Sequence, residues 1–398
     1  MFLAEIMILQ IMGNFTNSSY APLSHFIKLG FILNEASVGL ITSAVFIGSM
    51  SVSFLSGLVV DSLGPQRTMK ISYGILALGS LLAYFAQSYI FLIGAYYLVG
   101  AGYGMVTPAT NSSIMDHFFP RHASPMGIKQ SGVPIGTILA AIALPLIALH
   151  FSLRTAFLAL FIVTAVIALV IRGEKQGSIE KPTREKTRGT VRKVFSDRRV
   201  LIISAITAFL SWGQQSVFTY FVLYVTSINF QVLIAETMFI VLLLGSVMGR
   251  ILWPSITMRL FGGHRIRNYT LIMTLAGLML FIFPNTGGSI YAVAIMAVAI
   301  GFTAVAWNSN YVTLISEIAP KGNVGTYSGT SMMIISFGSI VGTPLSGFIV
   351  DSTGGTFGPM WMFLGSSLMF MALLLFLFTP RITAMMAKQE NFGNVPLK

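Results

Sequence analysis

The feature that most constrains the fold is a series of apolar runs, each about 20 residues long, that recurs along the chain. A helix rises about 1.5 Å per residue, so such a run crosses a hydrocarbon core of about 30 Å. Backbone groups must be paired within lipid, which leaves helices or a closed barrel, and the runs lack the alternation of barrel strands. The sequence therefore predicts an all-α protein that crosses a membrane many times.

Twelve such spans are predicted, and one long polar segment, residues 173–200, separates the first six from the last six. The predicted spans are 3–26, 37–60, 69–88, 90–117, 124–149, 153–172, 201–227, 235–258, 268–284, 289–316, 325–350 and 358–380. The first run begins close to Met1 without a cleavage pattern behind it, so we expect a retained span. The predicted domains are an N-terminal six-helix bundle (1–172), a basic linker (173–200), a C-terminal six-helix bundle (201–380) and a tail (381–398).

The charge distribution predicts the orientation of these spans. Hydrophobic residues make up 55% of the chain and charged residues 9%, yet the net charge is +12. Loops on one side hold most of the basic residues, namely Arg67, Lys70, Arg121, the stretch 172–199, Arg259, Arg265, Arg267, Lys321 and those of the tail. The other side holds Lys28 and Arg154. The positive-inside rule then places both termini in the cytoplasm of a multi-pass protein of the plasma membrane, and it accounts for the charge without nucleic acid. The linker either is solvated or attracts anionic headgroups.

The two halves of the chain carry related segments. An acid is followed by a proline after the fourth and tenth spans, in 116–120 and 317–320. Gly132-Val-Pro-Ile-Gly136-Thr137 in the fifth span matches Gly338-Ser-Ile-Val-Gly342-Thr343 in the eleventh. Glycines four apart share one helix face and permit close approach of a neighbouring helix. Paired halves of this kind are the plan of secondary transporters, whose solute site lies near the midplane between them.

The loop between the second and third spans carries the most specific motif, Gly57-Leu-Val-Val-Asp61-Ser-Leu-Gly64-Pro-Gln-Arg67. It resembles the G-x-x-x-D-x-x-G-x-x-R signature of the major facilitator superfamily, which occupies the same loop. The resemblance implies two pseudo-symmetric six-helix bundles, alternating access by rocking of the halves, and a gate at Gly57, Asp61, Gly64 and Arg67.

The equivalent loop of the second half keeps Gly262 and Arg265, but Arg259 stands where the family has an acid. We therefore expect the gate to depend mainly on Asp61. Residues 152–157 are similar to the family's W-R-x-x-F, with Leu153 in place of Trp. Gly347-Phe-Ile-Val-Asp351-Ser-Thr-Gly354 also matches the G-x-x-x-D-x-x-G spacing, but span counting places it on the outer side. There we expect a helix exit and turn without a gating role.

Two basic residues fall within spans, where a charge is costly and therefore a functional candidate. Arg250 lies nine residues before Arg259, about 13 Å from that end of its span. Lys129 lies about five residues into its span, shallow enough to reach the surface. Either residue binds an anionic solute or serves a structural role. The Gly249-Arg250 pair is similar to that of monocarboxylate transporters and oxalate/formate antiporters, which implies contact between the arginine and a substrate carboxylate. No acid lies clearly at mid-depth, which argues against cationic substrates.

Polar and aromatic residues in the spans complete the candidate site. Spans 1, 4, 7 and 10 line the cavity in the family, although some of their polar residues must serve helix-to-helix hydrogen bonding. The substrate-binding candidates are Arg250, Lys129, Gln130, Asn14, Asn17, Tyr20, Gln214, Gln215, Trp307, Asn308 and Asn310.

These observations favour a secondary transporter of a small organic anion, monocarboxylate-like, that works by proton symport or anion exchange. The alternative is an exporter of amphipathic drugs, suggested by 22 Met and 31 Phe residues. The sequence lacks H-E-x-x-H, G-x-S-x-G and Walker A patterns and has no cysteine, so we expect neither an enzyme nor a cofactor. The expected partners are a small-molecule substrate, protons and membrane lipids, without nucleic acid, and the expected state is a monomer.

Overall fold

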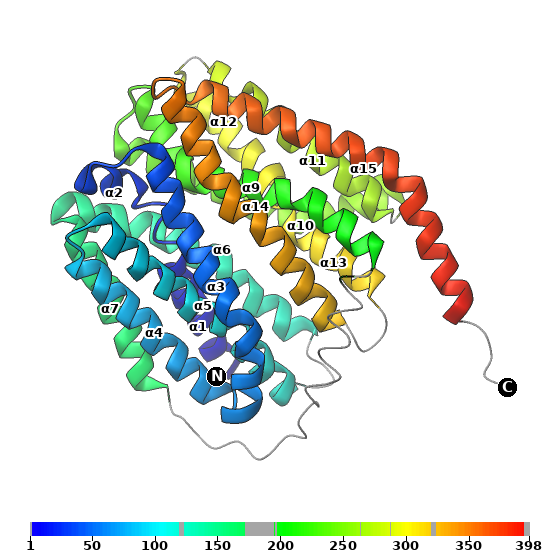
Figure 1. The fold of residues 1–398 in the computed structure, drawn as a ribbon, viewed down its shortest axis with the longest axis horizontal. Coiled ribbons are helices and arrows are strands. Elements are labelled where there is room, and N and C mark those ends of the chain that lie inside the picture. Colours follow the sequence, from blue (N-terminus) through cyan, green and yellow to red (C-terminus); the bar gives the residue numbers. More distant parts are fainter. Residues whose placement is uncertain are drawn as a thin grey trace. The chain divides into compact units, whose positions relative to one another are not determined.

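The structure is a computed structural model that describes residues 2–118, 123–171, 195, 197–262, 264–286, 288–319 and 324–393 (Figure 1). Helices account for nearly all of these residues, and the described part contains no strand. In chain order the elements are α1 (Phe2–Asn17), α2 (Ser24–Phe31), α3 (Glu35–Leu63), α4 (Pro65–Phe85), α5 (Tyr89–Phe118), α6 (Ala123–His150), α7 (Leu153–Val170), α9 (Arg198–Ser227), α10 (Val232–Phe261), α11 (Arg265–Ile282), η1 (Phe283–Thr286), α12 (Ile290–Ile300), η2 (Gly301–Val305), α13 (Asn308–Ile318), α14 (Val324–Ser352) and α15 (Gly358–Gly393). The predicted all-α membrane fold is confirmed.

Eleven of the described helical segments are long and apolar enough to cross a membrane, and they correspond to the second to twelfth predicted spans. The first predicted span, 3–26, is not one helix. Its helix α1 ends at Asn17, and turns lead to the short helix α2. Pro22 explains the break because a proline disfavours helical backbone in the residue before it. The C-terminal boundary of this span was therefore predicted wrongly.

The contacts divide the chain into two compact units. The first unit contains 1–181, 215–243 and 343–355, and the second contains 182–214, 244–342 and 356–398. The boundaries cut through α9, α10 and α14, so these units are not the two sequence halves. The predicted linker lies mostly outside the described residues, and the division into bundles at residues 173–200 stays a prediction.

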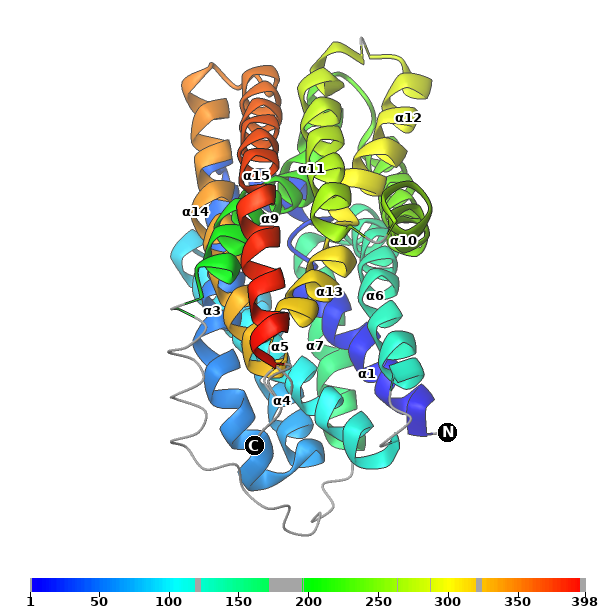
Figure 2. The same ribbon diagram turned by 90° about the vertical axis from the view of Figure 1, so that its right-hand side faces the viewer.

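Close helix contacts in the first unit occur at glycines. A Cβ on Gly136 of α6 would lie 3.0 Å from the Phe15 nitrogen of α1, and one on Gly132 would lie 3.3 Å from the Met7 oxygen. A Cβ on Gly104 of α5 would lie 2.6 Å from the Ser49 oxygen of α3. The close approach predicted for the fifth span is thus found between α6 and α1, which Figure 2 shows side by side.

The second unit repeats this packing with the matching motif. A Cβ on Gly338 of α14 would lie 2.6 Å from the Ala208 carbonyl carbon of α9, and Gly342 packs directly against the indole of Trp212. In the same unit α11 runs along α15, where a Cβ on Gly365 would lie 2.5 Å from the Gly277 oxygen (Figure 1). The two related glycine motifs therefore perform the same packing task in the two parts of the chain.

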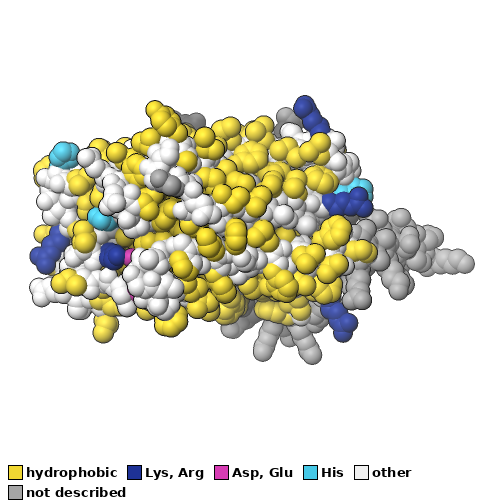
Figure 3. All heavy atoms as spheres, turned by 90° about the horizontal axis from the view of Figure 1, so that it is seen from above, with side chains coloured by type: hydrophobic (Ala, Val, Ile, Leu, Met, Phe, Trp, Pro, Cys, Tyr) yellow, Lys and Arg dark blue, Asp and Glu magenta, His cyan; other side chains and the backbone are white. Residues whose placement is uncertain are grey.

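The surface has the composition expected for contact with lipid. Large apolar side chains are strongly exposed along the spans, for example Leu169 at 79% and Ile295 at 69%. Hydrophobic side chains dominate the face seen in Figure 3, and Lys and Arg gather toward its two ends. This pattern suits a protein whose middle band faces hydrocarbon.

Candidate functional site

Lys129 is the most unusual side chain in the first unit. It lies on α6, is fully buried, and its Nζ donates a 2.7 Å hydrogen bond to Oδ1 of Asn111 on α5. No carboxylate of a described residue lies within ion-pair distance of this Nζ. The expectation that Lys129 reaches the membrane surface is wrong, because its side chain is enclosed between helices. A buried cation with a neutral partner is costly, so an anion at this place would lower its free energy.

A hydrogen-bonded group of polar side chains from α1 and α5 lies in the same part of the first unit as Lys129. Gln10 of α1 donates to the Tyr103 hydroxyl at 3.2 Å and accepts from the Thr110 hydroxyl at 3.3 Å. Thr110 precedes Asn111 on α5, and the Gln10 Cβ lies against Gly132, one turn after Lys129. Gln10 and Asn111 were not among the predicted site residues, although a glutamine inside an apolar run is itself a signal. Gln130 follows Lys129 but is exposed, so it does not share this enclosed position.

The predicted candidates at the end of α1 have more than one role. Asn14 donates to the Val133 oxygen and to the Thr137 hydroxyl of α6, both at 2.7 Å, which is helix-to-helix bonding. The Tyr20 hydroxyl donates to Oε1 of Gln215 on α9 at 2.7 Å. Asn17 has a buried Oδ1 without a partner among the described residues. Tyr20 and Asn17 therefore remain candidates, while the amide nitrogen of Asn14 already donates to two oxygens of α6.

A second polar cluster lies in the second unit, where the α12 segment becomes a π-helix over Gly301–Val305. Trp253 of α10 donates its Nε1–H to the Phe302 oxygen at 2.7 Å, and a Cβ on Gly249 would lie 2.5 Å from the same oxygen. Such π-helical turns release backbone groups and are frequent at functional sites. Arg250 follows Gly249 on α10 and is half-buried, which places this candidate beside the π-helical turn.

Two residues after the π-helix, Trp307 and Asn310, have buried N–H groups without an acceptor in the described part of the chain. Trp307 is 1% exposed and its Nε1–H has no acceptor among the described residues, and the same holds for the amide nitrogen of Asn310, which is 3% exposed. Asn308 instead donates to Oε1 of Gln214 on α9 at 2.9 Å. A buried donor without an acceptor costs about 1–3 kcal/mol, which a ligand oxygen would offset.

The predicted gate is described only in part. Gly57 and Asp61 fall within α3, but their side chains lie outside the described residues. Gly64 has φ +81° and separates α3 from α4, and Gly262 has φ +53° after α10, as a turn at each place requires. Arg67 is half-buried in the first turn of α4, and Arg259 is exposed near the end of α10.

The sequence did not predict an ion pair that joins Arg265, of the loop between the eighth and ninth spans, to Glu317. The Nε of Arg265 on α11 bonds to Oε1 of Glu317 on α13. The side chains are 25% and 44% exposed, so water screens the pair.

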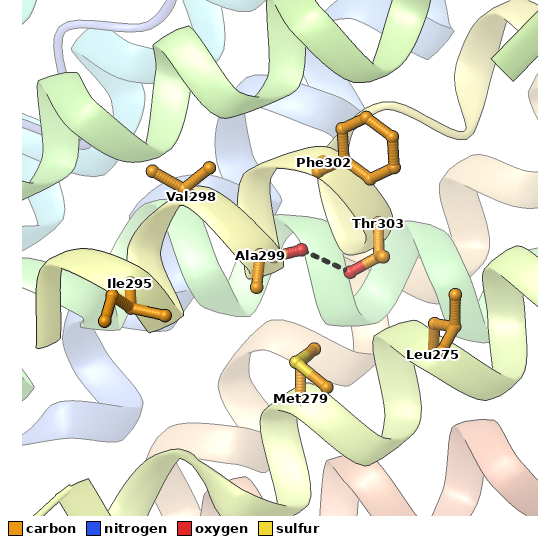
Figure 4. Close-up of a pocket in the computed structure, with 7 residues that line it drawn as sticks. All are labelled: Leu275, Met279, Ile295, Val298, Ala299, Phe302 and Thr303. Carbon is orange, nitrogen blue, oxygen red and sulfur yellow. Dashed lines mark hydrogen bonds between the residues drawn. The ribbon is translucent and has the colours of Figure 1, made fainter. Parts of the chain in front are cut away.

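Two cavities can be compared with these clusters, and the first of them is lined in part by the π-helix. The first, of about 510 Å³, lies between α11 and the segment formed by α12 and η2 (Figure 4). Its single hydroxyl, that of Thr303, bonds to the Ala299 oxygen at 2.7 Å, so the walls offer nothing polar to an anion. The second, of about 690 Å³, includes exposed Arg154 and Tyr89, whose hydroxyl already donates to the Ser37 oxygen at 2.8 Å. Neither contains any of the predicted substrate-binding residues.

Comparison with known proteins agrees with this architecture. The family model described as Major Facilitator Superfamily matches residues 6–343. A hexuronate transporter of Bacillus subtilis (strain 168) is 24% identical over 92% of this chain and 91% of its own. Monocarboxylate transporter 13 of Rattus norvegicus is 27% identical over 73% of this chain and 68% of its own, and an agnestins efflux protein of Paecilomyces divaricatus is 26% identical over 83% and 77%.

The fold also matches solved structures. The crystal structure of the nucleoside transporter NupG superimposes with a TM-score of 0.80 at 15% identity and covers 95% of this chain and 98% of that one. At this identity the similarity concerns the fold alone.

Proposed function

The chain belongs to the major facilitator superfamily of membrane transporters, and on this premise we propose that it moves a small organic anion across the membrane by alternating access. The proposed substrate is a monocarboxylate or a related acid. Transport would be driven by proton symport or by exchange against another anion. The observation that carries the proposal is the buried Lys129 with its neutral partner Asn111.

The chemistry around Lys129 favours an anion over a cation. Its ammonium donates to the neutral amide of Asn111, and no carboxylate of a described residue lies within ion-pair distance of it. A cationic solute would be repelled here, whereas a carboxylate would gain charge-assisted hydrogen bonds. We assign Lys129 the role of the principal charge for the substrate.

The cluster after the π-helix supports the same substrate class independently. The unused Trp307 Nε1–H and Asn310 amide are neutral donors, and a carboxylate oxygen is a suitable acceptor for both. Arg250 on α10 carries a guanidinium, whose forked donors match the geometry of a carboxylate. Its role follows from the family resemblance and stays a prediction.

The names of two relatives agree with this class. A hexuronate and a monocarboxylate each carry a carboxylate group, and these are the solutes in the names of the Bacillus and Rattus proteins. At 24–27% identity the names guide the choice of test compounds. Sugar acids and short monocarboxylates are therefore the first substrates to compare.

The second candidate function is export of amphipathic compounds, and the similarity to an efflux protein is the observation that favours it. The two functions predict different results in proteoliposomes. We expect saturable uptake of labelled glucuronate or lactate that unlabelled carboxylates inhibit and that ethidium leaves unchanged. An imposed proton gradient and a preloaded internal anion would separate symport from exchange.

Variants at Arg250 provide the site test. We expect Arg250→Ala to abolish most of the uptake, whereas Arg267→Ala removes an exposed arginine from α11 and should preserve it. Equal uptake by both variants would contradict the proposed contact with Arg250. Transport of ethidium without uptake of any carboxylate would instead support the exporter.

A further inference from the structure

The second G-x-x-x-D-x-x-G segment, Gly347 to Gly354, receives no role in the proposed transport site. It forms the last turns of α14, which ends at Ser352, and Gly354 has φ +70° in the turn that follows. The exit and turn expected from the sequence are present. The contacts of Gly347 and Asp351 within the first unit show that the segment does more than end a helix.

Asp351 caps the start of α3. Its Oδ1 accepts the backbone N–H of Glu35 at 2.9 Å, and its Oδ2 accepts that of Ala36 at 2.9 Å. The third N–H of the helix, that of Ser37, bonds to the N-cap residue Asn34 at 2.9 Å. The free N–H groups and the dipole of a helix N-terminus favour a negative charge, and this one uses both oxygens of a carboxylate more than 300 residues away in sequence.

Gly347 makes this cap possible. It lies one turn before Asp351 on the same face of α14, and a Cβ at this position would lie 2.5 Å from the Ala36 nitrogen. A side chain would push the start of α3 away from the carboxylate. The glycine and the aspartate four residues later therefore work as a pair, one permitting contact and the other bonding to the N–H groups.

A third helix joins the same contact. Tyr220 of α9 is fully buried, and its hydroxyl lies 2.8 Å from the Glu35 oxygen and 3.0 Å from the Thr343 oxygen of α14. The Glu35 side chain bonds to Lys28 of α2, which partly balances the charge beside Asp351. The ends of α3, α9 and α14 are thus joined by a few polar bonds.

We propose that Gly347, Asp351 and Tyr220 form an outer latch, which bonds to Glu35 and Ala36 and closes the predicted outer side of the transporter. The inner motif, with Gly57 and Asp61 at the other end of α3, has the same spacing. Opening to the outer side requires the Asp351 bonds to break and water to replace them. The inference rests on the alternating access of the proposed function, but it is independent of the substrate.

The latch is tested by a distance measurement that needs no substrate. The chain contains no cysteine, so Leu40→Cys on α3 and Thr353→Cys in the turn after α14 give two unique sites for spin labels. In liposomes, pulsed electron spin resonance would report the distance between the two helix ends. We compare Asp351→Asn, which retains size but provides one acceptor oxygen, with Ser352→Ala, whose hydroxyl bonds only within α14.

We expect Asp351→Asn to raise the ratio of long to short distances roughly tenfold, or about 1.4 kcal/mol, because the amide loses the charge and leaves one N–H of α3 without its acceptor. Tyr220→Phe should also raise the ratio of long to short distances. This variant provides the test if Asp351→Asn is not recovered in a folded state. Ser352→Ala should reproduce the parent distribution. Unchanged distances in folded Asp351→Asn or Tyr220→Phe would overturn the latch. Uptake assays on the parent chain test the proposed function separately.

Discussion

Replacing Gly347 by alanine isolates the steric part of the contact between α14 and α3. The substitution adds one methyl group and leaves every polar group of the latch in place. The new Cβ would lie 2.5 Å from the Ala36 nitrogen, about 0.9 Å closer than the 3.4 Å at which ordinary contact begins. The Cβ is fixed to the backbone of α14 and the nitrogen belongs to the backbone of α3, so no side-chain rotation can make room.

The size of the effect follows from this geometry. Relief requires α14 and the start of α3 to separate by nearly 1 Å, which would lengthen the 2.9 Å bonds of Asp351 toward the limit of hydrogen bonding. Overpacking of this kind costs about 1–3 kcal/mol. The intrinsic gain of an alanine over a glycine within a helix, about 0.5–1 kcal/mol, offsets only part of that cost.

The prediction is tested by the midpoint of thermal unfolding of the purified protein, followed by tryptophan fluorescence. Gly74→Ala on α4 is the matched control because a Cβ there meets no atom within 4 Å. We expect Gly347→Ala to lower the apparent midpoint by a few degrees and Gly74→Ala to leave it equal or higher. If Gly347→Ala is as stable as Gly74→Ala, the close backbone contact is not part of the folded state.

Three further substitutions test other parts of the structure. Asn14→Ala removes two 2.7 Å bonds to α6, one to the Val133 oxygen and one to the Thr137 hydroxyl, so a loss of about 1–3 kcal/mol should appear as a lower unfolding midpoint. Arg265→Gln breaks the exposed ion pair with Glu317. It should lower the free energy of unfolding by less than about 1 kcal/mol, and the difference should vanish in high salt. A large loss of stability would show that water does not screen the pair. Trp307→Phe removes a buried donor that has no acceptor among the described residues. The protein without substrate should therefore keep its stability while carboxylate uptake falls. A loss of stability would instead indicate that the indole supports the fold.

Much of the fold could be predicted from the sequence because lipid restricts the chain to helices of a certain length. Eleven spans follow from that rule, and the packing of Gly132 and Gly136 follows from the spacing of two small residues on one helix face. The break after Asn17 was missed because apolar residues continue through 18–23, so hydropathy alone places no boundary there. Pro22 was the available local signal.

The candidate site was less predictable because burial and pairing depend on neighbouring helices. Lys129 could be located near a span end, but its enclosure and its bond to Asn111 arise from the packing of α6 against α5. Asp351 had the spacing of a gating motif, and its position on the predicted outer side argued against that role. Its partners, the N–H groups of Glu35 and Ala36, lie in a distant part of the sequence and carry no signal in their residue type.

Uptake by Lys129→Met tests whether the buried cation of the first unit recognises an organic anion. Methionine preserves the length of the side chain and removes the charge, while Lys70→Met removes an exposed lysine of α4 as a control. In proteoliposomes with equal amounts of folded protein, we predict that Lys70→Met takes up labelled carboxylate at the parent rate and that Lys129→Met loses at least nine-tenths of it, roughly the loss of one charged hydrogen bond. Parent-level uptake by Lys129→Met would show that the Lys129 ammonium does not bind the substrate.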